Sequence, residues 1–137
     1  MAYLERTPAG PRGRIGAAAE SAAADRLRQD GWTILARNLR VGGHELDLLA
    51  RDPLDALVVV EVRARSGPTF GSGLESVDAR KVARLYRAAA MLRRSGHPAV
   101  GPGPLAQPLR VDLLTLRRAG DGSWRVEAHL HGLEPPR

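Results

Sequence analysis

Residues 43–65 read GHELDLLARDPLDALVVVEVRAR, and this stretch decides the fold that we expect. Its first part predicts a strand in which one side of the pleat carries Glu45, Asp47 and Leu49. The other side of that strand carries Leu46 and Leu48. The run 57–60 is apolar without a break, which is typical of a strand buried on both faces. We therefore expect two neighbouring strands joined by a short turn that contains a proline.

Charged residues follow the second apolar run on one side of its strand: Glu61, Arg63 and Arg65. A charge at the end of a buried strand is costly unless it is paired or bound to a metal ion. Asp47 precedes Glu61 by thirteen intervening residues, and Arg63 follows after one. This spacing matches the D-x(n)-[DE]-x-K pattern of metal-dependent nucleases, with arginine in the lysine position.

The composition suits one compact domain over residues 1–137, because 43% of the 137 residues are hydrophobic. The chain has no cysteine, which excludes disulfides and thiolate metal sites. No apolar run approaches the ~20 residues of a membrane span, and the first residues do not resemble a signal peptide. We therefore expect a cytoplasmic protein that does not bind membranes. The net charge of +6 favours polyanionic partners.

The predicted elements follow the order αβββαββ, which gives an α/β sandwich around a mixed central sheet. The helices are expected at 14–30 and 76–94, and the strands at 32–40, 45–50, 57–65, 109–116 and 124–131. Gly31 suits the residue after the first helix, with Trp32 folding back onto its last turn. Residues 1–12 are expected to form a loose arm, and residues 132–137 a frayed tail.

The second predicted helix has a basic side that carries Arg80, Lys81, Arg84 and Arg87. Such a side serves solubility or contacts nucleic acid, and the charge pattern alone favours neither. The closely spaced His129 and His131 lie in the last predicted strand, where we favour a solvated face over a metal site.

Two carboxylates from adjacent strands suit a hard divalent ion such as Mg²⁺ or Mn²⁺, which prefers oxygen ligands. Asp47 and Glu61 could supply them in a phosphodiester hydrolase, where a metal polarises the phosphate and lowers the pKa of water. Arg63 could stabilise charge that develops on the phosphate, but its high pKa prevents it from acting as a general base.

The chain resembles the YraN family of small bacterial proteins over about Gly13 to Leu114. The matching residues occur in order along the chain: Gly16, Glu20, Ala23, Arg37-Asn38, Gly43, Glu45-Leu46-Asp47-Leu48, Val60-Glu61-Val62-Arg63, Phe70-Gly71, Val77, Lys81 and Arg110-Val111-Asp112. The resemblance implies a restriction-endonuclease-like fold, similar to that of archaeal Holliday-junction resolvases.

The resemblance further implies that Asp47 and Glu61 are the main metal ligands and that Glu20 assists them, directly or through water. It also places Arg63 in the catalytic-lysine position. We expect supporting groups around this site without direct contact to the metal: Glu45, Lys81 and Asp112.

Three functions are compatible with the sequence, and the first of them is the one that we predict. The first is a metal-dependent endonuclease acting on structured DNA, such as branched junctions. The second is a nucleic-acid-binding protein with the nuclease fold but no turnover. In the third, the charged residues of the two strands form only a structural ladder of ion pairs. A homodimer is one of the assembly states that the sequence leaves open.

Overall fold

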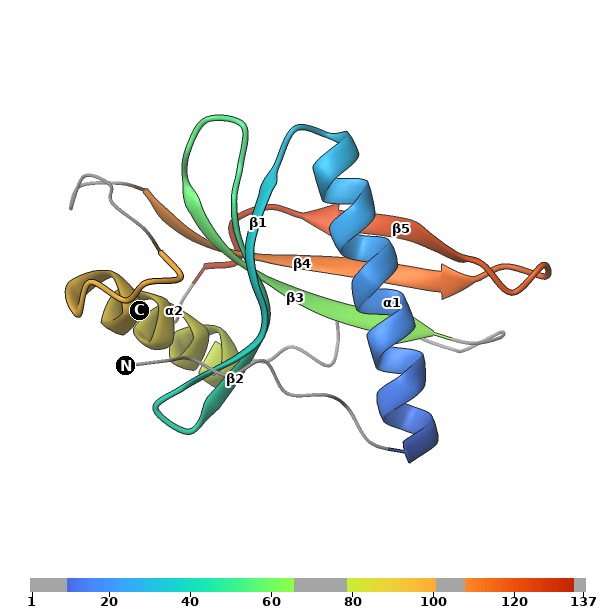
Figure 1. The fold of residues 1–137 in the computed structure, drawn as a ribbon, viewed down its shortest axis with the longest axis horizontal. Coiled ribbons are helices and arrows are strands. Elements are labelled where there is room, and N and C mark those ends of the chain that lie inside the picture. Colours follow the sequence, from blue (N-terminus) through green and yellow to red (C-terminus); the bar gives the residue numbers. More distant parts are fainter. Residues whose placement is uncertain (1–9, 66–78, 101–107, 135–137) are drawn as a thin grey trace.

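The computed structural model of the chain describes residues 10–65, 79–100 and 108–134 (Figure 1). Their elements follow the order α1 (Gly10–Gln29), β1 (Thr33–Val41), β2 (His44–Arg51), β3 (Leu57–Arg65), α2 (Ala79–Arg94), β4 (Leu109–Arg118) and β5 (Trp124–Leu130). The predicted order αβββαββ is therefore confirmed.

The five strands form one mixed sheet in the spatial order β1-β2-β3-β4-β5. Strands β3 and β4 are parallel, and the other neighbouring pairs are antiparallel. Because α2 lies between β3 and β4 in the chain, it forms the crossover that a parallel pair requires. The hairpin between β1 and β2 turns on Gly42 and Gly43, both of which have positive φ angles of 53° and 84°.

Helix α1 ends as the sequence predicts. Gly31 has a φ angle of 89°, and its N–H donates to the Arg28 carbonyl. The Trp32 N–H donates to the Leu27 carbonyl at 2.9 Å, which completes a Schellman cap. The other end differs from the prediction, because α1 already begins at Gly10, within the segment expected to form a loose arm. Residues 1–9 lie outside the described ranges.

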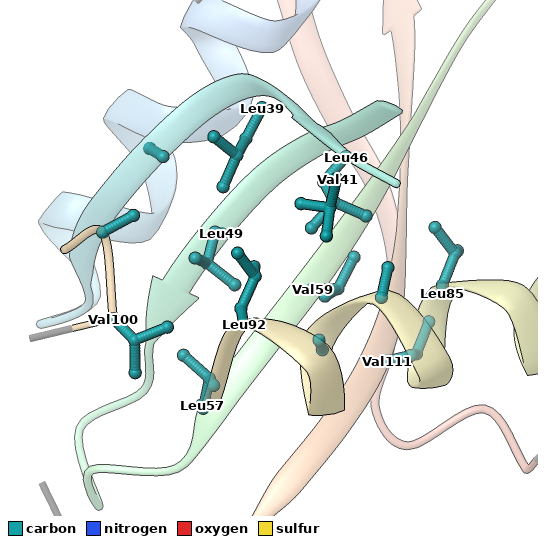
Figure 2. Packing of buried hydrophobic residues seen from close by; sticks show 14 residues of the cluster. Leu39, Val41, Leu46, Leu49, Leu57, Val59, Leu85, Leu92, Val100 and Val111 are labelled. Atoms are coloured by element: carbon teal, nitrogen blue, oxygen red, sulfur yellow. The ribbon is translucent and has the colours of Figure 1, made fainter. Parts of the chain in front are cut away.

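The two helices cover opposite faces of the sheet, and each buries its own hydrophobic cluster. Figure 1 shows α1 crossing over β3, β4 and β5. Its cluster includes Leu27 and Trp32, packed against β-strand residues such as Val58. On the other face, α2 contributes Leu85 and Leu92 to a cluster with residues of β1 to β4 (Figure 2). The unbroken apolar run of β3 serves both clusters, since its side chains alternate between them.

The alternation predicted for β2 is broken, because Leu46 packs in the α2 cluster and Leu48 in the α1 cluster. Asn38, on the neighbouring β1, has a φ angle of 51°, which interrupts the regular pleat at this level. The pairing of β1 with β2 resumes on each side of it, from Arg37 with Leu48 to Leu39 with Leu46. Regular alternation therefore cannot be extended across this point.

The tail predicted to fray from residue 132 is held at its start. The Leu133 N–H donates to the Val111 carbonyl at 2.7 Å, and the Tyr86 hydroxyl donates to the Leu133 carbonyl at 2.9 Å. The glycine-rich stretch 66–73 and the predicted start of the second helix at Ser76 lie outside the described residues. Neither described helix is long and apolar enough to cross a membrane.

Candidate active site

Asp47 and Glu61 lie where β2 and β3 stop pairing. The last paired residues of the two strands are Leu48 and Val60, each one position away from an acidic residue. Beyond this pair, the Val62 N–H donates to Asp47 Oδ2 at 2.8 Å. The carboxylate therefore takes the place of a backbone acceptor and connects the strands where they diverge.

A cavity of about 440 Å³ opens at this divergence. Its acidic lining comes from three elements and consists of Glu20 of α1, Glu45 and Asp47 of β2, and Glu61 of β3. The small residues Gly16 and Ala19 of α1 also line it, so the helix leaves room beside the strands. The structure thus brings together the three carboxylates that the sequence analysis assigned to one metal site, although their catalytic roles stay predictions.

Two cations enter the cavity from different elements. Lys81 of α2 places its Nζ 2.6 Å from Glu61 Oε1. Arg63 of β3 reaches the same oxygen with Nη2 at 3.6 Å. The Lys81 side chain is 30% exposed and lines the cavity, beside which it was expected as a supporting group. Arg65 points elsewhere and pairs with Glu127 of β5 at 2.6 Å.

Buried carboxylate oxygens at the cavity have unused bonding capacity. In the described part of the chain, Glu20 Oε2 and Glu61 Oε2 are buried and have no hydrogen-bond partner. An unpaired buried acceptor costs free energy, and carboxylate oxygens of this kind can be satisfied by a cation. The oxygen donor set therefore fits a hard divalent ion such as Mg²⁺ or Mn²⁺.

The cavity also disfavours the charged form of its acids. Burial, followed by the nearby Glu61, raises the pKa of Asp47 to about 8. Burial likewise raises the pKa of Glu20, although a hydrogen bond from Asn38 and the charge of Arg37 oppose the rise. Carboxylates whose pKa values are raised by one another's charge are typical of sites that hold a cation.

The predicted metal ligands Glu20, Asp47 and Glu61 are spread more widely than the ligands of a compact metal site. Among the residues described, the trio whose ligand atoms all lie within 4.8 Å of one another is instead Asp112, His129 and His131. This spread agrees with an arrangement in which Glu20 assists through water.

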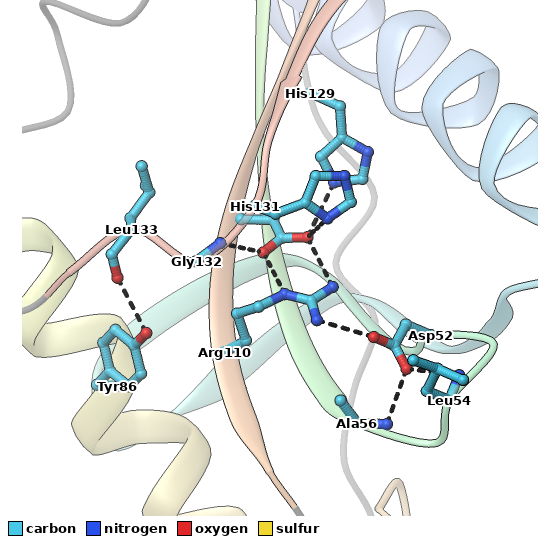
Figure 3. A network of polar contacts seen from close by, with 10 residues as sticks. Asp52, Leu54, Ala56, Tyr86, Arg110, His129, His131, Gly132 and Leu133 are labelled. Atoms are coloured by element: carbon cyan, nitrogen blue, oxygen red, sulfur yellow. Dashed lines mark hydrogen bonds and ion pairs between the residues drawn. The ribbon is translucent and has the colours of Figure 1, made fainter.

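Asp112 does not line the cavity, so its predicted supporting position there is wrong. The parallel register of β3 and β4 pairs Asp112 with Val60, and Leu113 with Glu61. Because neighbouring side chains in a strand alternate, Asp112 faces the opposite side of the sheet from Glu61. Its carboxylate instead accepts hydrogen bonds from Arg110, His129 and Gly132 (Figure 3).

These partners determine the pKa of Asp112. Burial alone would raise it, but the hydrogen bonds from His129, Arg110 and Gly132 outweigh burial and hold the pKa below its ordinary value. His129 is therefore part of a buried network rather than a solvated face, whereas the side chain of His131 is 58% exposed. Burial and the neighbouring His129 lower the pKa of His131.

A second hollow of about 440 Å³ adjoins the first, and Glu45 and Lys81 line both of them. Arg84 of α2 lines this hollow together with Gly43 and His44. Arg80, Arg84 and Arg87 are all exposed, so the basic side of α2 faces solvent beside the acidic cavity.

Comparison with known proteins identifies relatives over most of the chain. The model of the uncharacterised protein family UPF0102 matches residues 19–116. A UPF0102 protein of Deinococcus radiodurans is 40% identical over 86% of this chain and 94% of its own length. One of Parafrankia sp. is 42% identical over 83% of this chain and 91% of its own length. Among solved structures, Pyrococcus furiosus SfsA in complex with Ca²⁺ matches with a TM-score of 0.41 at 16% identity, covering 95% of this chain and 69% of that one.

Proposed function

The chain belongs to the uncharacterised protein family UPF0102, and we propose that it is a metal-dependent endonuclease that hydrolyses phosphodiester bonds of structured DNA. One observation carries the proposal: Glu20, Asp47 and Glu61 line a single cavity into which Lys81 also projects. Acidic metal ligands beside a cation are what phosphodiester hydrolysis requires. The resemblance to the YraN family, described above, agrees with this chemistry.

Asp47 and Glu61 are the residues that would hold the ion, since both end the pairing of adjacent strands and face one cavity. Glu20, which lines the same cavity from α1, would assist the ion through water. A bound Mg²⁺ or Mn²⁺ supplies Lewis-acid polarisation of the phosphate and a lowered pKa for water. Asp47 would release its proton when the ion binds, since its pKa of about 8 keeps it largely protonated at neutral pH without metal.

Lys81 and Arg63 have different tasks in this proposal. Arg63 provides a fixed positive charge and a bidentate partner for phosphate oxygens. The amine of Lys81 can both donate and accept a proton, and it already contacts Glu61 at 2.6 Å. We therefore assign the part that lysine takes in the D-x(n)-[DE]-x-K pattern to Lys81, which reaches the site from α2 instead of β3.

The basic side of α2 would hold the DNA backbone. Arg84 lines the hollow that adjoins the cavity, and exposed Arg80 and Arg87 extend the same charge along the helix. Contacts from arginine side chains to phosphates are independent of base sequence. Substrate choice would then rest on the shape of the DNA, as for branched junctions or flaps.

A cleavage assay tests the proposal on linear, flapped and four-way-junction DNA with Mg²⁺ or Mn²⁺. The parent should cut at least one structured substrate, and addition of a chelator should stop it. Asp47→Asn should abolish cleavage, while Asp25→Asn, an exposed carboxylate on α1, should leave it unchanged. If the parent binds these substrates but never cuts them with either metal, the nuclease proposal fails and a binding function replaces it.

A further inference from the structure

We infer that Asp112, His129 and His131 form a second metal site, which binds a transition metal of the zinc class. The β4–β5 register brings the three together, because it pairs Leu114 with His129 and Leu113 with Leu130. Because the strands are antiparallel, one further step in this register places His131 opposite Asp112. Since residues two apart in a strand share a face, both imidazoles meet the one carboxylate.

The ligand atoms of the three residues all lie within 4.8 Å of one another. His129 Nε2 lies 2.9 Å from Asp112 Oδ2, and His131 Nδ1 lies 3.4 Å from the same oxygen. For metal–ligand bonds of about 2.05 Å, these separations correspond to angles of about 90° and about 110° at the metal. Both values suit a tetrahedral or five-coordinate ion, which the two imidazoles reach by turning out of their present stacked arrangement, in which the ring centroids lie 3.9 Å apart. An ion would replace the proton that His129 and Asp112 now share.

The charge of the surrounding network favours a cation. Arg110 is shared by two carboxylates, with Nη1 2.8 Å from Asp52 and Nε 2.7 Å from Asp112. Two carboxylates and one guanidinium thus meet in this network, which favours an added cation beside the histidines. In the view of Figure 3, His129 and His131 lie together above Arg110.

The groups around the trio hold its carboxylate in place. Arg110 Nε and the Gly132 N–H both donate to Asp112 Oδ1, and Arg110 Nη2 donates to Oδ2 at 3.1 Å. The Trp32 ring lies 5.5 Å from the His129 ring and 6.4 Å from the His131 ring, which adds an apolar wall. Such hydrogen bonds and apolar surroundings orient metal ligands and strengthen binding.

One side of the site is open to solution, because the His131 side chain is 58% exposed. A free position there can take water as a further ligand. Two imidazoles and one carboxylate suit Zn²⁺, Co²⁺ or Ni²⁺ better than Mg²⁺, which prefers oxygen alone. This site therefore differs in metal preference from the carboxylate cavity, and it does not depend on the proposed nuclease activity.

Titration of the full chain with Co²⁺, followed by visible absorption, tests this inference. The parent for this experiment carries Asp47→Asn and Glu61→Gln, so that the cavity cannot supply both of its ligands. One equivalent of Co²⁺ should bind and give the intense bands of a tetrahedral or five-coordinate ion. His131→Ala should weaken binding at least tenfold. His44→Ala, at the start of β2, is the matched control and should bind like the parent.

A thermal melt with and without Zn²⁺ gives a second measurement. Zn²⁺ should raise the Tm of the parent and of His44→Ala but not that of His131→Ala, since binding to the folded state stabilises it. His131 is exposed, so its removal should leave the metal-free protein folded. The inference is overturned if the parent binds no Co²⁺, or if His131→Ala binds it as tightly. Failure of the nuclease proposal would appear separately, in the cleavage assay with all three ligands intact.

Discussion

Glu61 is the residue on which the cations of the cavity converge. Its Oε1 contacts Lys81 at 2.6 Å and lies 3.6 Å from Arg63, while its Oε2 is buried without a hydrogen-bond partner among the described residues. One oxygen is thus used by cations of the chain, and the other is free to bind an added ion. Glu61 would therefore link the proposed metal ion to Lys81, the side chain that we expect to move protons.

The first prediction concerns Lys81. Lys81→Ala should lower the cleavage rate about 100-fold or more, since both a positioned cation and a proton carrier are lost. Lys81→Arg should bind DNA like the parent but reach only part of the parent's cleavage rate, because arginine keeps the charge and cannot exchange the proton. Single-turnover cleavage with saturating enzyme measures the rate, and a binding assay in Ca²⁺ measures affinity. Equal rates for Lys81→Ala and the parent would exclude Lys81 from catalysis.

The second prediction concerns the proton of Asp47 in the metal-free protein. Its pKa is raised from 3.8 to about 8, so between these values the folded chain holds a proton that the unfolded chain has lost. The free energy of unfolding should then fall as the pH rises, by at most about 1.4 kcal/mol per pH unit. This contribution is fully present below pH 3.8 and is lost by pH 8.

Asp47→Asn removes this titration while keeping a neutral side chain of the same shape. Its stability relative to the parent should therefore increase steadily from pH 5 to pH 8 and level off above. Urea unfolding in the presence of a chelator measures the difference, and Asp25→Asn provides a constant baseline. Parallel pH profiles for Asp47→Asn and the parent would show that Asp47 is not protonated in the folded state.

The sequence could predict Asp47 and Glu61 as a pair because strand periodicity and their spacing are local properties. The helical pattern alone could not place Lys81, which was expected near the site only through the family resemblance, since the rotation of α2 against the sheet is set by packing of Leu85 and Leu92. Asp112 was misplaced because its face depends on the parallel register of β3 and β4. The histidine pair carried a readable signal, two imidazoles at spacing two in a strand, but their carboxylate partner lies seventeen residues before His129.

At the scale of the element, α2 combines a buried side with an exposed basic one. Its buried residues fill the cluster on one face of the sheet: Val82, Leu85, Ala88, Ala89 and Leu92. The opposite side presents Arg80, Arg84 and Arg87 to solvent. Lys81 lies between the two sides, which is why it reaches the cavity. The helix thus packs against the sheet, contributes Lys81 to the cavity and presents a basic surface, which we propose contacts phosphates.

The third prediction tests that surface. Replacing Arg84 and Arg87 together by alanine should weaken DNA binding to a similar extent for every sequence. The slope of log K against log salt should fall by about two, since each lost phosphate contact contributes about one. Arg28→Ala on α1 is the control, because Arg28 is exposed and lies at the other helix. Unchanged affinity and slope in the double variant would mean that this side of α2 does not contact DNA and serves only solubility.

Strand positions could be predicted closely because apolar runs and turn residues mark their ends, and β3 matches the expected 57–65. The side-chain alternation of β2 could not, since it changes beside Asn38, a non-glycine residue with positive φ. Such a conformation depends on surrounding contacts rather than on local propensity. The start of α1 was likewise missed, because Pro11 was interpreted as part of a loop although proline is accepted in the first turn of a helix.

At the scale of the whole molecule, one sheet separates two hydrophobic clusters. The carboxylate cavity lies where β2 and β3 diverge. The trio of Asp112, His129 and His131 lies on the α1 side, between β4 and the end of β5. Both sites therefore depend on the same strands, and β3 and β4 contribute to both clusters. Loss of packing on either face should unfold both sites together.

The last prediction tests whether the two clusters unfold as one cooperative unit, and with it the single domain expected from the sequence. Leu27 and Leu92 are each 1% exposed, one in the α1 cluster and the other in the α2 cluster. Each change to alanine should lower the free energy of unfolding by about 2–5 kcal/mol, because it removes buried methyl groups and leaves a cavity. Leu54→Ala, at a side chain that is 90% exposed, should stay within about 0.5 kcal/mol of the parent.

The sheet keeps Leu27 and Leu92 out of contact, so the two losses should add within about 0.5 kcal/mol in the double variant. If the clusters belong to one cooperative unit, each variant should also show a single unfolding transition, with the same midpoint by tryptophan fluorescence and by circular dichroism. Trp32 and Trp124 both pack on the α1 side, so fluorescence reports that face directly. A Leu92→Ala protein whose circular dichroism changes at lower denaturant than its fluorescence would mean that the α2 face unfolds separately.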